Sequence, residues 1–150
     1  MQFVETQISG VKIIVPSLFS DDRGYFYESF RGDIMDINGI SSSFIQDNQA
    51  GSENKVIRGL HYQLKYPQAK LVSVTVGKVL DVAVDIRRGS PTFGEHISTI
   101  LSDKNHKMMF IPEGFAHGYS VLSDTAIFHY KCTNIYHKED QYGVRWDDPE

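Results

Sequence analysis

Residues 72–86 carry the pattern that decides the fold class, and they read VSVTVGKVLDVAVDI. Apolar and polar side chains alternate on both sides of Gly77-Lys78, with the period of two residues that is typical of half-buried β-strands. We interpret the stretch as a β-hairpin that turns at Gly77-Lys78. In its second strand Asp81 and Asp85 share one face, which is either a solvent-facing edge or the lining of a barrel that holds a polar ligand.

Short runs rich in β-branched and aromatic residues continue on both sides of this stretch. Turn sequences such as Asp22-Arg23-Gly24 and Pro112-Glu113-Gly114 separate them at short intervals. The one helical candidate is 33–37, which is followed by Asn38-Gly39, where glycine can adopt the left-handed conformation that ends a helix. Many short strands at this spacing predict an all-β jelly-roll or cupin-type barrel. The further expected strands are 11–15, 25–30, 44–48, 56–62, 96–101, 108–111, 117–122 and 126–133.

Length, charge and cysteine content restrict the class of function. The chain has 150 residues, a common size for one domain, so we expect a single domain over 1–150. A net charge of -4 without a long Lys/Arg run argues against nucleic acid as a partner. The N-terminus has no signal-peptide pattern and no run reaches the ~18 apolar residues of a membrane helix, so we expect a cytoplasmic protein. Cys132 is the only cysteine, and we expect it to be a buried apolar residue without a catalytic role.

The densest group of candidate chemical residues lies in 56–63, which reads VIRGLHYQ. It carries Arg58 and His61, and Lys70 follows at the start of the next expected strand. Taken singly, each has an ordinary structural explanation as an ion pair, a core histidine or a solvated lysine. Their concentration on two neighbouring strands of an acidic protein makes them candidates for a site.

Two further groups lie in the second half of the chain. His117 follows the turn at 112–114 and begins a strand, which places it at a rim. Tyr130 shares a strand face with Phe128 and Cys132, and we expect that face to point inward. Core packing is the ordinary explanation for such a tyrosine. A buried hydroxyl nevertheless needs a partner, and a ligand or a reacting proton is one.

The motifs argue against a metal ion and a nucleotide cofactor. Barrels of this kind often bind a metal through two histidines one residue apart, but the six histidines never form His-x-His. A phosphate-binding P-loop and a Gly-x-Gly-x-x-Gly turn are also absent from the sequence. We therefore expect no metal and no cofactor.

Several long motifs, in order, resemble the dTDP-4-dehydrorhamnose 3,5-epimerase family over about residues 19–149. They occupy 22–28, 46–48, 58–63, 70–72, 81–87, 90–94, 111–118 and 146–149. The resemblance implies a jelly-roll subunit that forms a homodimer and acts on a nucleotide-linked 4-keto-6-deoxy sugar, inverting C3, C5 or both. It also places the product in the synthesis of rhamnose or another deoxysugar for a surface polysaccharide.

The resemblance also implies roles for single residues. His61 is implied as the base that removes the proton beside the C4 ketone, Tyr130 as the acid on the opposite face, and Lys70 as positive charge near the C4 oxygen. Asp81 matches an acidic position in the pocket, where it orients a cation or a histidine. Substrate contacts are implied for Gln46, Asn48, Arg58, His117 and Tyr136. Arg23, Phe26 and Glu28 are implied to reach into the partner's site.

The chemistry suits these residue types. A proton beside a ketone becomes removable when the enolate oxygen is stabilised, and a preorganised cation in a poorly solvated pocket contributes about 3 to 4 kcal/mol. Histidine supplies a base with a pKa near the working pH. The reaction needs no cofactor.

The sequence departs from the family at two points. Family members usually continue past the matched region into a segment whose aspartate pairs with the base histidine. Asp81, Asp85 or a carboxylate from another segment is therefore a candidate for orienting His61, because an unoriented base can lose about 10⁴ in rate. The segment 62–69 also differs, with Ala69 where glycine is common, so a different sugar or base is an open alternative.

Two other functions remain as alternatives. A 3,4-ketoisomerase of the same barrel would move the carbonyl, but that group usually has two nearby histidines, unlike His61-Tyr62-Gln63. A sugar-nucleotide-binding barrel without turnover would keep the pocket and lack the chemistry.

Overall fold

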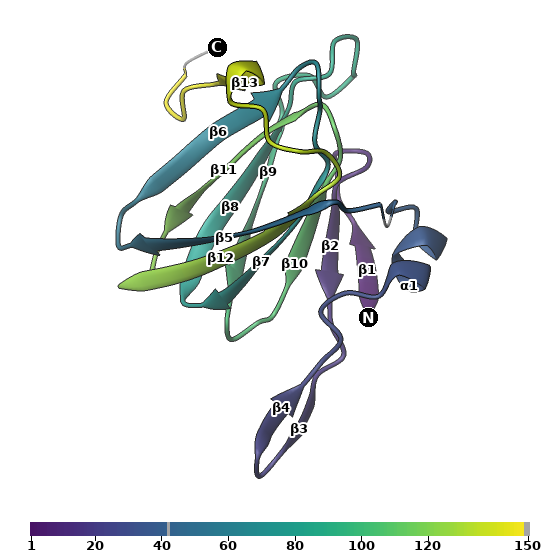
Figure 1. The fold of residues 1–150 in the computed structure, drawn as a ribbon, viewed down its shortest axis with the longest axis vertical. Helices are drawn as coiled ribbons and strands as arrows, with labels where there is room; N and C mark the ends of the chain where they lie inside the picture. The colour runs from purple at the N-terminus through teal and green to yellow at the C-terminus, as the bar shows by residue number, and fades with distance from the viewer. Residues whose placement is uncertain (42, 149–150) are drawn as a thin grey trace.

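The structure is a computed structural model and describes residues 1–41 and 43–148. Its main strands form two antiparallel sheets that pack face to face (Figure 1). The first sheet has the order β1 (Gln2–Glu5), β2 (Lys12–Val15), β10 (Met108–Ile111), β7 (Lys70–Val76), β12 (Thr125–Cys132) and β5 (Gln46–Glu53). The second has the order β13 (Gln141–Gly143), β6 (Ile57–Gln63), β11 (Phe115–Val121), β8 (Lys78–Asp85) and β9 (His96–Ser102). The predicted all-β jelly-roll architecture is confirmed.

Three smaller elements lie outside these sheets. Strands β3 (Phe19–Asp21) and β4 (Gly24–Phe26) pair into a hairpin, here called the arm, that projects away from the body of the molecule (Figure 1). Helix α1 (Gly32–Ile37) confirms the predicted helix, and Gly39 after it has a φ of +74°. A 3₁₀ turn, η1 (Lys138–Asp140), precedes β13. No helix among the described residues is long and apolar enough to cross a membrane.

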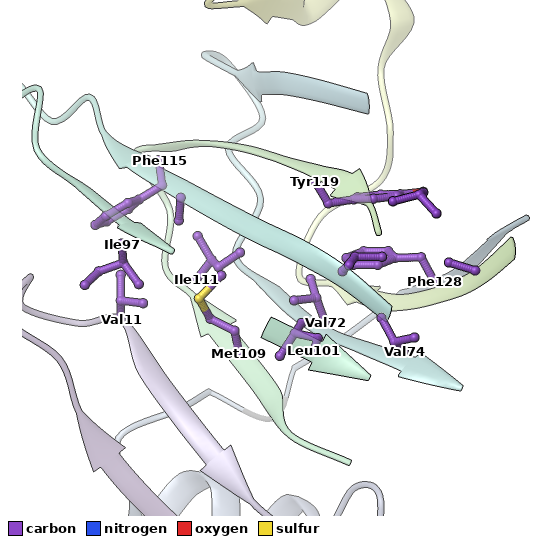
Figure 2. Close-up of a cluster of buried hydrophobic side chains, with 14 of the residues drawn as sticks. Val11, Val72, Val74, Ile97, Leu101, Met109, Ile111, Phe115, Tyr119 and Phe128 are labelled. Atoms are coloured by element: carbon purple, nitrogen blue, oxygen red, sulfur yellow. The ribbon is translucent and has the colours of Figure 1, made fainter. Parts of the chain in front are cut away.

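The main core fills the space between the two sheets with inward-facing apolar side chains from both. There Phe128 of β12 lies close to Val72 of β7 and Tyr119 of β11, whereas Phe115 of β11 lies at the other end of the same cluster (Figure 2). The Tyr119 and Phe128 rings stack with centroids 4.1 Å apart. The cleft described below is built from the strands around this aromatic pair.

A second core covers the outer face of the first sheet. Leu71 of β7 and Phe110 of β10 point outward and pack under Met35 of α1 and Ile40. The outer face of the second sheet differs, because Leu80 and its neighbours on alternate positions of β8 are only half buried. The two sheets are therefore covered unequally.

The predicted hairpin at 72–86 is wrong. Strand β7 pairs with β10 and β12, whereas β8 pairs with β11 and β9, so the two strands lie in different sheets. The chain crosses between the sheets at Gly77, whose φ is +79° and whose added Cβ would lie 2.1 Å from the Thr125 carbonyl oxygen. Alternation shows that a strand has one buried face, but it does not identify the strand beside it.

Several strand limits also differ from expectation. The run at 25–30 is strand only to Phe26, and the run at 44–48 becomes β5, which extends to Glu53 through the small residues Ala50-Gly51-Ser52. Strands β1, β3 and β13 carry no clear sequence pattern. Pro149, the last residue of the 146–149 motif, lies outside the described residues.

Candidate active site

A cleft opens between the sheets where β5, β7 and β12 face β6 and β11. Two pockets of about 270 and 420 Å³ share His61, Lys70 and Tyr130 as lining residues. The first is also lined by Gln46, Asn48, Tyr62, Gln63, Gln68, Cys132, Tyr136 and Gln141. The second is also lined by Ala50, Ile57, Arg58, Gly59, His117, Gly118, Tyr119 and Phe128. Most of the residues singled out from the sequence therefore meet in one place.

A register shift in β6 brings two of these residues to the same side. His61 lies opposite His117 on β11, while Arg58, three positions earlier, lies opposite Tyr119, only two positions later. In a regular strand Arg58 and His61 would point to opposite faces. The extra residue in β6 lets both line the cleft.

Two glycines permit this close pairing of β6 with β11. An added Cβ at Gly59, whose φ is +100°, would lie 2.5 Å from the His117 carbonyl oxygen. An added Cβ at Gly118 would lie 2.5 Å from the Arg58 carbonyl oxygen. Backbone alone fits here, so these glycines fix the position of the His61 strand.

The His61 imidazole is suited to accept a proton. Its partial burial lowers its pKa below 6.5, and electrostatic interactions with Lys70 and His117 lower it further. A pKa below 6.5 means that the ring is neutral near pH 7. A neutral imidazole in the cleft can act as a general base.

Lys70 and Tyr130 stand on the facing sheet. Burial lowers the pKa of the Lys70 ammonium, and the Asp81 carboxylate opposes that shift. Burial raises the pKa of the Tyr130 phenol, so the hydroxyl keeps its proton at neutral pH and can donate it. Tyr130 lies opposite Asn48 and Val72, with Phe128 and Cys132 on the same inward face, as predicted. Cys132 is buried, also as predicted, but it lines the smaller pocket as well.

Asp81 is a wholly buried partner of His117. The His117 Nε2 atom lies 2.6 Å from Asp81 Oδ1, and the two side chains are 7% and 0% exposed. The solvent-facing alternative for Asp81 is therefore wrong. The second carboxylate oxygen of Asp81 has no hydrogen-bond partner among the described residues and is buried.

Asp85 is buried too, but it stabilises a turn and does not face the cleft. It accepts hydrogen bonds from the Arg87 guanidinium, at 2.7 and 2.9 Å, and from the Ser90 and Thr92 hydroxyls, both at 2.6 Å. The Arg87 bond is the main reason that the pKa of Asp85 lies well below its usual range. Asp81 pairs with His117 and Asp85 with Arg87, so neither of the two orients His61.

Polar side chains of β5 form a connected wall of the cleft. The Gln46 side chain donates to Asn48 Oδ1 at 2.9 Å and accepts the Tyr136 N–H at 2.8 Å. Arg58 donates to the Ser52 hydroxyl at 2.9 Å and to the Gly51 carbonyl at 3.1 Å. These contacts hold hydrogen-bonding groups and a guanidinium near the three shared residues.

The structure does not bring Arg23, Phe26 or Glu28 into this cleft. Arg23 bonds Asp21 within the arm, and Glu28 lies 3.6 Å from Arg31. Phe26 is 66% exposed, at the end of β4. Within this chain the three residues are separate from the site.

Sequence reasoning missed several lining residues, chiefly Tyr62, Gln63, Gln68, Tyr119 and Gln141. Gln63 lies two residues after His61, so the two share one face of the strand, and this alternation could have identified Gln63 as a lining residue. Tyr62 lies on β6 beside His61, and the remaining three come from a loop, from β11 and from β13, whose positions depend on tertiary packing. Among residues 1–41 and 43–148, no three His, Cys, Asp or Glu side chains gather as metal ligands.

Chemically, the cleft offers a base and an acid from opposite walls. His61 comes from the second sheet and Tyr130 from the first, and Lys70 extends from β7 beside Tyr130. A flat ring placed between the sheets would meet a proton acceptor on one face and a proton donor on the other. Such an arrangement can remove and return a proton on opposite faces of one carbon.

Comparison with known proteins agrees with this chemistry. A family model described as dTDP-4-dehydrorhamnose 3,5-epimerase matches residues 5–150. The protein of that name from Methanothermobacter thermautotrophicus is 49% identical over 149 residues, which are 99% of this chain and 80% of the relative.

Solved structures of the same kind superpose closely. A dTDP-6-deoxy-D-glucose-3,5-epimerase of Legionella pneumophila, in complex with dTDP-4-keto-L-rhamnose, has a TM-score of 0.96 and 50% identity, covering 99% of this chain and 79% of that one. A dTDP-4-dehydrorhamnose 3,5-epimerase of Bacillus anthracis, with TDP and PPi bound, has a TM-score of 0.96 and 41% identity, covering 99% and 86%.

Proposed function

The chain belongs to the dTDP-4-dehydrorhamnose 3,5-epimerase family, and from this premise we propose that it inverts C3 and C5 of a dTDP-linked 4-keto-6-deoxy hexose. It is an isomerase of the carbohydrate epimerase class. The observation that carries the proposal is the position of His61 and Tyr130 on opposite walls of one cleft, with Lys70 shared by both pockets.

The proposed reaction moves one proton at each inverted carbon. The His61 imidazole takes the proton beside the C4 ketone, and the electron pair moves to the C4 oxygen to form an enolate. The Lys70 ammonium stabilises that oxygen, a contribution of about 3 to 4 kcal/mol for a preorganised donor. The Tyr130 hydroxyl then gives its proton to the opposite face of the carbon. His61 releases its proton to solvent and Tyr130 takes one up, which resets the site.

The nucleotide end of the substrate is proposed to lie along the polar wall. Arg58 supplies a permanently charged guanidinium for the diphosphate, because its fork geometry matches phosphate oxygens. Gln46, Asn48 and Tyr136 offer hydrogen bonds and a ring for the nucleoside. His117, held by Asp81, adds an imidazole ring nitrogen on the His61 side. The carboxylate that would orient His61 stays a prediction, with a segment other than β8 as its source.

A homodimer is proposed for two reasons. The arm projects from the body of the molecule (Figure 1) and exposes Phe19 and Phe26 by 65% and 66%. It is suited to carry Arg23 and Phe26, with Glu28 just after it, into a partner's site. The half-buried outer face of the second sheet offers a surface for the second copy. Cytoplasmic location stays a prediction from the sequence.

Hydrogen exchange in deuterated water tests the reaction. The protein is incubated with dTDP-4-keto-6-deoxyglucose, and the C3 and C5 protons are followed by NMR. We expect exchange at both carbons, its loss in His61→Ala, and slower inversion with residual exchange in Tyr130→Phe, where the base is still present. Exchange at one carbon would show a single-centre epimerase.

The same spectra separate the alternatives. A carbonyl that moves from C4 to C3 would show a 3,4-ketoisomerase. Bound substrate without any exchange, measured at several enzyme concentrations, would contradict an epimerase and leave a binding barrel.

A further inference from the structure

One buried side chain beside the cleft uses its whole carboxamide on backbone groups. Gln63 is 7% exposed and lies two residues after His61 on β6. Its Nε2 atom donates to the Tyr66 carbonyl at 2.7 Å and to the Ile135 carbonyl at 3.2 Å, and its Oε1 atom accepts the His137 N–H at 2.7 Å. Both of its N–H groups are occupied, so Gln63 has none to offer a substrate.

These three bonds join two loops that lie far apart in sequence. One is 64–69, between β6 and β7, and the other is 133–137, after β12. Asp140, 2% exposed, adds a second tie because its Oδ2 atom accepts the Lys65 and Tyr66 N–H groups, both at 2.9 Å. The Tyr66 and His137 rings stack across the junction at 4.0 Å.

The backbone groups that Gln63 binds lie on either side of Tyr136, whose side chain lines the pocket. Gln63 binds the backbone of Ile135 and His137, the neighbours of Tyr136 on either side. Tyr136 lines the 270 Å³ pocket, and its own N–H bonds Gln46, which in turn bonds Asn48. Hydrogen bonds, joined by the backbone of residues 135–137, therefore link Gln63 to the polar wall of the cleft.

We propose that Gln63 is a positioning residue that sets the affinity for the nucleotide part of the substrate by fixing Tyr136 and Gln46. This inference rests on the proposed function and deepens it. Gln63 acts through the two loops and not on the reacting carbon. Its loss should therefore weaken binding far more than it slows proton transfer.

Two substitutions of Gln63 separate its donor and acceptor functions. Gln63→Leu removes all three bonds, whereas Gln63→Glu keeps the acceptor for His137 but faces a carboxylate toward the Tyr66 and Ile135 carbonyls. We expect both to raise KM for the keto sugar and Kd for dTDP about tenfold, with kcat changed by less than about twofold. Tyr136→Ala should have a similar effect, and the double variant Gln63→Leu/Tyr136→Ala should be little worse than either alone, because the two act as one unit.

Asn105→Leu is the matched control. The Asn105 carboxamide also binds three backbone groups, those of Ile100, Ser102 and Lys107, in the loop between β9 and β10. We expect it to lower Tm as Gln63→Leu does and to leave KM unchanged.

Amide hydrogen exchange gives a readout that does not depend on turnover. Faster exchange at Lys65 and Tyr66 is expected in both Gln63 variants, and faster exchange at His137 in Gln63→Leu, which lacks the acceptor for that N–H. Wild-type KM, Kd and exchange rates in these variants would overturn the inference while the proposed function stands. If the wild-type protein shows neither turnover nor dTDP binding, the proposed function is wrong. Even in that case, unchanged amide exchange of the two loops in the Gln63 variants would overturn the role of Gln63 in fixing the loops.

Discussion

At the scale of single residues, burial and the charge on Lys70 both shift the protonation of His61. Burial is the main cause of the low His61 pKa, and the nearby ammonium adds to it because two positive charges repel in a poorly solvated cleft. The folded pKa lies below 6.5, so the base is neutral at pH 7 and becomes protonated only as the pH falls through that lower value. We therefore expect kcat/KM to fall on the acid side of pH 6.5.

Removal of the Lys70 charge should move the His61 titration to higher pH. In Lys70→Met the repulsion is gone, so the pKa of His61 rises toward 6.5. NMR titration of the labelled His61 ring measures the shift directly, even if the variant has lost turnover. Lys78→Met, an exposed lysine at the start of β8, is the control and should leave the curve in place. An unchanged or lower His61 pKa in Lys70→Met would contradict this coupling.

Residue types and alternation predicted which side chains could gather, but not how the buried carboxylates pair. Asp81 lies opposite Tyr119 on β11, and His117 lies opposite Ala83, so Asp81 and His117 form a diagonal contact across two strands. The sequence left Asp81, Asp85 and a third segment as equal candidates for His61. Only strand register assigns Asp81 to His117 and leaves Asp85 to its own turn.

At the scale of elements, the pairing of β6 with β11 depends on glycine. Gly59 needs both a positive φ and the absence of a Cβ, since backbone atoms of β11 stand 2.5 to 2.7 Å from where that atom would lie. Gly39 needs only the positive φ, because nothing lies within 4 Å of its added Cβ. The two positions therefore separate conformational strain from steric contact.

Alanine at these positions should have unequal costs. Gly39→Ala is expected to lower the free energy of unfolding by about 1 to 2 kcal/mol, the cost of the left-handed conformation. Gly59→Ala should cost about 1 to 3 kcal/mol more through overpacking and should reduce kcat/KM, because it displaces Arg58 and His61. Urea unfolding of both variants measures the difference. Equal losses would mean that β6 and β11 can move apart without cost.

At the scale of elements, the local sequence pattern predicted the limits of some strands but not which strands pair. Strands β10 and β12 were predicted within a residue of their limits because both carry continuous apolar or alternating runs. The neighbours of β7 in the sheet are β10 and β12, which come much later in the chain. The predicted hairpin was wrong because β7 and β8 are adjacent in sequence but do not pair. The short β13, which closes the cleft beside β6, has no pattern of its own and is placed by pairing with β6.

At the scale of the whole molecule, unequal covering of the two sheets is the basis for the proposed interface with a second copy. Helix α1 and Ile40 after it cover outward-facing residues of β2, β7 and β10 in the first sheet. The second sheet instead presents Leu80, Val82 and Val84 half buried, beside an apolar groove of about 230 Å³ that Trp146 also lines. Alternation along β8 explains this, because Leu80, Val82 and Val84 occupy the face opposite the buried Asp81, Ala83 and Asp85. One domain over 1–150 stays a prediction.

A charge in the middle of this face should separate the copies. A stable interface buries about 800 Å² on each partner, and a lysine ammonium at its centre would have to be desolvated. Val82→Lys is therefore expected to convert a dimer into a monomer of 17.0 kDa in sedimentation velocity. Val76→Lys is the control, since Val76 is 41% exposed at the end of β7 in the other sheet and should leave the dimer intact.

Activity gives the second arm of that experiment. If the arm of one copy completes the cleft of the other, the Val82→Lys monomer keeps His61, Lys70 and Tyr130 and still loses affinity for the keto sugar. Its activity per molecule should rise with protein concentration, as association recovers the missing contacts, while Val76→Lys shows no such dependence. A wild-type protein that sediments as a monomer with full activity would contradict both the interface and the shared site, because every group that the reaction needs would then lie in one chain.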